Sequence, residues 1–142
     1  MKSSVFVHGL QAAGVITVLV GLVHCSFHRI FGWQRAFASL SVHNVKVLTT
    51  IHIGATLFLL LVGALTLRYA EMLSRSTEPA SVLCVALSLF WAWRLVWQLT
   101  YLKPSPLRPD GRLLALYYVF ALVFAFLVIA YGAPVAARVL GA

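Results

Sequence analysis

The chain consists mainly of four long apolar runs, each ended by charged residues. A helix that crosses a bilayer needs about 20 predominantly apolar residues, and each run meets that length. The runs predict four membrane spans, near residues 5–27, 47–67, 79–102 and 113–137. Because the connections are short, consecutive helices are expected to be antiparallel neighbours. The predicted fold is an all-α integral membrane protein, a four-transmembrane-helix antiparallel bundle with both termini on the same side. Residues 1–142 would form a single membrane domain.

Proline and charge mark the ends of the runs. Pro79 suits the first turn of a helix, where its missing N–H costs nothing. The segment 103–112, with three prolines in Lys-Pro-Ser-Pro-Leu-Arg-Pro-Asp-Gly-Arg, cannot be helical throughout. It is therefore expected to be the loop between the third and fourth spans.

Each predicted span carries a stripe of small or polar residues at spacings of three and four. In the first two spans the stripes are Gln11, Gly14, Thr17, Gly21, His24 and His28, then Thr49, His52, Thr56, Leu59, Gly63 and Thr66. In the last two they are Ser81, Cys84, Ser88, Trp91, Arg94, Gln98 and Tyr101, then Tyr118, Ala121, Ala125, Val128 and Gly132. Small residues let membrane helices approach closely, so these stripes predict the packed faces.

Composition agrees with a membrane protein. The chain is 62% hydrophobic and only 10% charged, whereas soluble domains contain about 25% charged residues. Eleven Lys and Arg residues oppose three acidic ones, but they fall singly at segment ends and form no patch. That distribution suits lipid headgroups. The lipid bilayer is the expected partner, and nucleic acid is not.

The flanking charges predict an orientation. The loops after the first and third spans hold six basic residues, Arg29, Arg35, Lys46, Lys103, Arg108 and Arg112. The other side holds four, Lys2, Arg68, Arg75 and Arg138. The positive-inside rule then places the two loops in the cytoplasm and the termini in the periplasm. Because the usage of Ala, Leu and Arg over Lys is typical of a GC-rich bacterium, the expected location is a bacterial inner membrane.

Two histidines are expected at similar depth on adjacent helices. At 1.5 Å per residue, His24 lies about 6–8 Å below Arg29, and His52 about 9 Å below Lys46. Bundle cores commonly hold cofactors, and haem iron accepts histidine ligands. One hypothesis is therefore that His24 and His52 are metal ligands to the iron of haem b. His28, one turn from His24, is the competing ligand. Packing or interfacial histidines, an all-histidine metal site and a quinone or lipid site are alternatives.

Arg94 is the one basic residue inside a predicted span, and no span contains an acidic residue. Its charge could reach water, hydrogen-bond to carbonyls and Gln98, stack on Trp91 or Trp97, or meet an anionic group such as a haem propionate. Charged residues within spans are costly and mark functional sites. Two further aromatic residues on the same side, Tyr101 and Tyr118, complete the candidate ligand or packing set.

The spans exclude several chemistries. A di-iron carboxylate site or paired-carboxylate catalysis requires acidic residues that the spans lack. The sequence contains no Gly-rich phosphate loop, Ser-His-Asp set or Cys-rich metal spacing. These exclusions leave open whether the protein is an enzyme.

Two resemblances frame the functional hypotheses. Four spans with His24 and His52 in one plane look like small membrane cytochromes b, which implies electron transfer, with a quinone link as a further option.

Arg94 followed by Tyr101, a basic loop and a last span looks like the third span of the membrane-associated eicosanoid and glutathione metabolism proteins. That resemblance covers about a quarter of the chain and implies binding of lipid or glutathione. The family's Arg, Asn and Glu pattern is reduced here to His43-Asn44, without the Glu.

Three hypotheses thus remain open. The first is b-type haem binding and membrane electron transfer. The second is a non-enzymatic membrane subunit or assembly factor, whose stripes pack within a larger membrane complex or a homo-oligomer. The third is a small membrane enzyme or binder in which Arg94 and Tyr101 contact a lipid or glutathione-type ligand.

Overall fold

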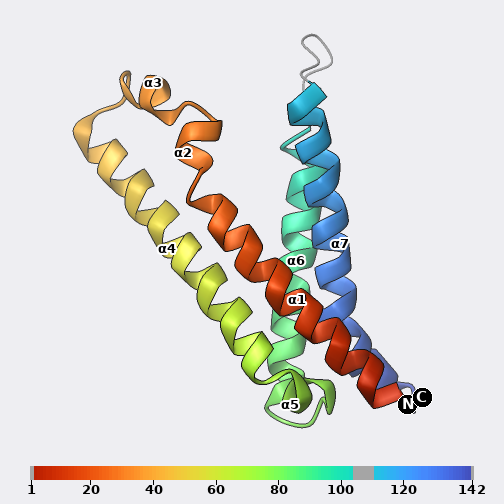
Figure 1. Cartoon of the computed structure of the whole chain (residues 1–142). Helices are drawn as coiled ribbons and strands as arrows, with labels where there is room; N and C mark the ends of the chain where they lie inside the picture. Colours follow the sequence, from red (N-terminus) through yellow and green to blue (C-terminus); the bar gives the residue numbers. More distant parts are fainter. Residues whose placement is uncertain (1, 104–110, 142) are drawn as a thin grey trace. The chain divides into compact units, whose positions relative to one another are not determined.

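The computed structural model describes residues 2–103 and 111–141, and the regular structure in these ranges is α-helical (Figure 1). The helices are α1 (Lys2–His24), α2 (Phe27–Ile30), α3 (Trp33–Phe37), α4 (Val42–Arg68), α5 (Ala70–Ser74), α6 (Ala80–Thr100) and α7 (Gly111–Val139). Four of them, α1, α4, α6 and α7, are long and apolar enough to cross a membrane. The prediction of an all-α chain with four such helices is therefore confirmed.

Some helix ends differ from the expected ones. α4 begins at Val42, five residues before the predicted start at 47. The reason is local, because the Ser41 hydroxyl accepts a hydrogen bond from the Asn44 backbone N–H at 3.3 Å. A serine in this position stabilises the first turn of a helix even among polar residues. Most of the predicted proline-rich loop, residues 104–110 with Arg108 and Asp110, lies outside the described residues.

The chain forms two compact units, residues 14–68 and residues 1–13 with 69–142. In the first unit, α1 and α4 meet backbone to backbone through glycines. A Cβ atom added to Gly63 would lie 2.8 Å from the Val18 nitrogen and 2.9 Å from the Gly14 oxygen. The buried residues of α4 are Thr56, Leu59, Gly63 and Thr66, which confirms these four positions of its predicted stripe. Small residues thus set the closest approach of these helices.

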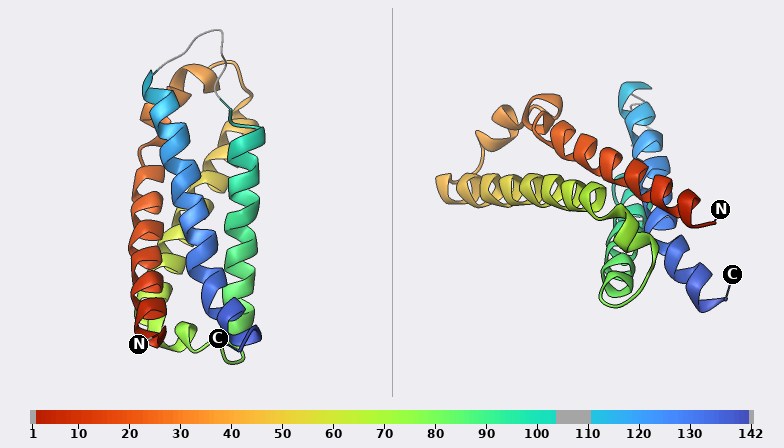
Figure 2. Two further views of the ribbon diagram at one scale, coloured as in Figure 1. Left: turned by 90° about the vertical axis from the view of Figure 1, so that its right-hand side faces the viewer. Right: turned by 60° about the horizontal axis from the view of Figure 1, so that its bottom comes forward.

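In the second unit, α6 packs along α7 (Figures 1 and 2). The Ser88 hydroxyl of α6 donates a hydrogen bond to the Val128 carbonyl of α7 at 3.0 Å. The buried residues of α7 are Phe124, Leu127, Ala130, Tyr131 and Pro134. These buried positions are not those of the predicted stripe, although the stripe residues Val128 and Gly132 do lie against Ser88 of α6.

The glycine contact gives a stability test. Gly63→Ala is expected to destabilise the protein by about 1–3 kcal/mol, because its Cβ would press on backbone atoms that cannot move aside. Gly54 of the same helix is the matched control, since a Cβ there meets nothing within 4 Å. Unfolding of both variants in bicelles, followed by circular dichroism, measures the difference. Equal stability of the two variants would contradict the close contact.

Candidate functional site

His24 and His52 lie against each other within the 14–68 unit. Their ring centroids are 5.5 Å apart and their planes differ by 13°. His24 is the last residue of α1, and His52 lies about 15 Å along α4 from Val42, as expected at 1.5 Å per residue. The structure therefore brings together the two histidines that the sequence pairs by depth.

Two aromatic side chains complete this histidine–aromatic cluster, defined as His24, Phe27, Trp33 and His52. The Phe27 ring lies 4.2 Å from the His24 ring, and the Trp33 ring meets the His52 ring edge-on at 4.8 Å. All four side chains are half-buried. Gly32, with a φ of 60°, makes the turn between α2 and α3, a conformation that glycine adopts without strain. That turn places Trp33 beside α4, a contact that sequence reasoning missed.

His28 does not join the cluster. It is exposed, and its Nδ1 lies 3.0 Å from the Cys25 carbonyl oxygen on the preceding turn. His28 instead lines a pocket of roughly 750 Å³ formed by α2 and α3. The lining residues of this basic pocket are His28, Arg29, Ile30, Phe31, Gly32, Gln34 and Arg35. Within the described residues, no group of three or more His, Cys, Asp or Glu side chains is placed to hold a metal ion.

Arg94 belongs to the other unit, where aromatic rings surround its charge. Its guanidinium carbon lies 5.4 Å from the centre of the Phe124 ring and 5.7 Å from that of Trp93. Arginine over an aromatic face is attracted by the ring quadrupole, more strongly where water is excluded. The expected stacking partners were Trp91 and Trp97. Trp91 instead stacks on Phe124 at 5.5 Å, so that Phe124 carries both contacts.

The other candidate residues near Arg94 serve different contacts. The Gln98 amide donates to the Tyr117 carbonyl of α7 at 3.3 Å, which ties the ends of α6 and α7 together. Tyr101 is 72% exposed and stacks on Trp97 at 4.7 Å. Tyr118 is exposed and meets Tyr117 edge-on. Trp91 is fully buried, and its indole N–H has no hydrogen-bond partner among the described residues.

The candidate residues therefore form two separate groups. One is the histidine–aromatic cluster of residues 14–68, and the other surrounds Arg94 in the second unit. Each group is built within its own unit. A common site for Arg94 and the histidines stays a prediction.

No family model, curated protein or solved structure matches the chain.

The contact between Arg94 and Phe124 can be measured directly. Arg94→Met and Phe124→Leu keep most of the side-chain volume and remove the charge or the ring. We expect a coupling energy of about 0.5–2 kcal/mol between them in a double-mutant cycle. Leu122→Ala replaces Phe124→Leu in the control cycle, because Leu122 is 72% exposed. A coupling no larger than that of the control would show that the ring does not stabilise the charge.

Proposed function

We propose that the protein binds a b-type haem through His24 and His52 and transfers electrons within the membrane. The observation that carries this proposal is the juxtaposition of the two imidazoles on two membrane-crossing helices. Ionisable side chains at such depth are costly and mark functional sites. The pair draws one ligand from each helix, as bundle cofactor sites do.

The separation of the rings suits two ligands of one metal. Imidazole nitrogens are common metal ligands, and haem iron is among the metals they bind. The ring centroids are 5.5 Å apart, so both imidazoles would lie within reach of one metal ion. The Phe27 and Trp33 rings beside the two histidines would add apolar contacts to a bound haem.

The basic pocket of α2 and α3 contains positive charges that would pair with the carboxylates of a haem. Arg29 and Arg35 both line it, and they belong to the segment that also contains Phe27 and Trp33. Arginine forms paired hydrogen bonds with carboxylates. Arg29 and Arg35 would therefore be the residues that pair with the carboxylates of a bound haem.

This proposal includes the finer topology. The four long helices form an antiparallel bundle with both termini on the same, periplasmic, side of a bacterial inner membrane. The histidine pair then lies in the cytoplasmic leaflet, close to the loop that carries Arg29 and Arg35. Electrons would pass to a quinone or to a partner in a larger membrane complex.

A second candidate function is a packing subunit without a cofactor. The observation that favours it is the tight contact of Gly14 with Gly63, together with the hydroxyls that bond to their own helices. These features explain the polar stripes without any ligand. The packing of Arg94 on Trp93 and Phe124 explains its charge in the same way. A substrate role for Arg94 and Tyr101 stays a prediction.

The visible absorption spectrum tests haem binding. The protein purified in mild detergent, or reconstituted with haem, is expected to show a Soret band and sharp α and β peaks after reduction with dithionite. His24→Ala and His52→Ala are each expected to lower the haem content at least tenfold, because each removes a side chain that would hold the iron. Visible absorption and the haem-to-protein ratio provide the measurement.

The remaining histidines are the matched controls. His8→Ala and His43→Ala should keep full haem content, and so should His28→Ala, whose imidazole lies outside the cluster. Circular dichroism of each variant shows whether it is folded. A folded wild-type protein that stays colourless with excess haem would overturn haem binding and favour the packing subunit.

A further inference from the structure

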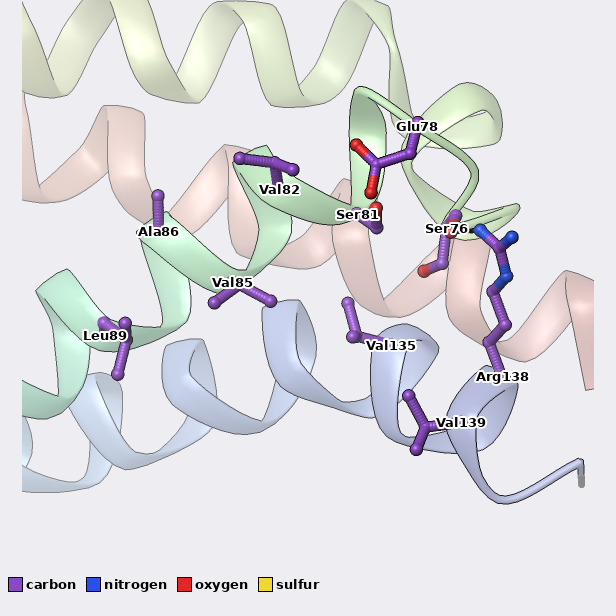
Figure 3. Close-up of a pocket in the computed structure, with 10 residues that line it drawn as sticks. All are labelled: Ser76, Glu78, Ser81, Val82, Val85, Ala86, Leu89, Val135, Arg138 and Val139. Carbon is purple, nitrogen blue, oxygen red and sulfur yellow. Dashed lines mark hydrogen bonds between the residues drawn. The ribbon is translucent and has the colours of Figure 1, made fainter.

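A groove lies between α6 and α7, at the end of the unit that contains α5 (Figure 3). It encloses roughly 590 Å³. Its mouth is polar and is formed by Ser76, Glu78, Ser81 and Arg138. Beyond the mouth the walls are apolar, with Val82, Val85 and Leu89 from α6 and Val135 and Val139 from α7. The groove is thus polar at one end and apolar along its length.

The depth of the groove fits an acyl chain. From Ser81 to Leu89 the α6 axis advances about 12 Å at 1.5 Å per residue. One leaflet of the hydrocarbon core is about 15 Å thick, half of roughly 30 Å. Val82 and Leu89 are 59% and 65% exposed, as side chains facing lipid would be. A chain that enters at the mouth would therefore run through most of one leaflet.

The mouth carries one charge of each sign. The Arg138 guanidinium donates one hydrogen bond to the Ser76 carbonyl, which holds it against the connection before α6. A guanidinium has five N–H donors, so others remain for a ligand. The Glu78 carboxylate makes no ion pair or hydrogen bond with any described residue. Figure 3 shows it beside Ser81 at the same mouth.

We propose that this groove binds a zwitterionic phospholipid with a primary amine, of the phosphatidylethanolamine class. The lipid phosphate pairs with Arg138, because the guanidinium fork matches phosphate oxygens. The ammonium group donates its N–H bonds to Glu78. A choline headgroup has no N–H to donate, and an anionic glycerol headgroup brings no cation to Glu78. This site is independent of the haem proposal, since its residues all lie in the other unit.

Lipid selectivity is the direct test. Delipidated full-length protein in detergent is titrated with dioleoyl phosphatidylethanolamine, phosphatidylcholine and phosphatidylglycerol, and bound lipid is counted by native mass spectrometry. The ethanolamine lipid is expected to bind at least about tenfold more tightly than the other two, as a charged hydrogen bond provides. Glycerophosphoethanolamine, which has no acyl chains, should not compete. Equal affinities, a preference for phosphatidylglycerol, or competition by the chain-free headgroup would overturn the proposal.

Substitutions at the polar mouth and along the apolar walls test the two parts of the groove separately. Glu78→Gln should remove the preference for the ethanolamine lipid and leave phosphatidylcholine binding unchanged. Arg138→Gln should weaken all three lipids, and Arg138→Lys should restore much of the loss. Ala86→Phe, which fills the groove, should also weaken all three. Glu71→Gln, Arg75→Gln and Ala55→Phe are the matched controls outside the groove. Equal losses in the controls would contradict the assignment.

Discussion

Hydrocarbon offers no hydrogen-bond partner, and four helices of this chain are long and apolar enough to cross it. Two threonine hydroxyls bond within their own helix. Thr56 donates to the His52 carbonyl at 2.9 Å and Thr66 to the Val62 carbonyl at 2.8 Å. Ser88 instead donates across to α7. Each of these hydrogen bonds satisfies the hydroxyl within the protein. Hydroxyl side chains on a span are therefore compatible with surrounding lipid.

The imidazoles of His24 and His52 and the Arg94 guanidinium lie instead against aromatic rings. Phe27 and Trp33 enclose the paired histidines, while Trp93 and Phe124 cover Arg94. The two groups differ in what they leave for a ligand. The guanidinium already lies over two rings, which stabilise its charge. The histidines bring two potential metal ligands to one point. The functional proposal therefore rests on the histidines.

Much of the fold is predictable from the sequence, because the signals are periodic and strong. Apolar length identifies the four long helices, and small residues at spacings of three and four identify the buried face of α4. The α7 face is not found in this way, since Phe124 and Tyr131 are as apolar as their lipid-facing neighbours. Only the stacking on Trp91 of α6 distinguishes Phe124. A single sequence does not predict such a contact between helices.

The candidate site is predictable in part for a similar reason. Helix geometry sets depth, so His24 and His52 could be paired from their distances to Arg29 and Lys46. Trp33 could not be assigned to them, because its position depends on the left-handed turn at Gly32. The partner of Arg94 was also missed. Phe124 is one of several phenylalanines on α7, and nothing in their spacing selects it.

The central claim is that His24 and His52 ligate one iron, and electron paramagnetic resonance of the oxidised protein tests it most directly. Ligation by both imidazoles should give a low-spin ferric signal. Loss of either histidine should convert it to a high-spin signal or abolish it. A haem-loaded protein with a high-spin signal, or one whose low-spin signal survives in both His24→Ala and His52→Ala, would contradict ligation by this pair.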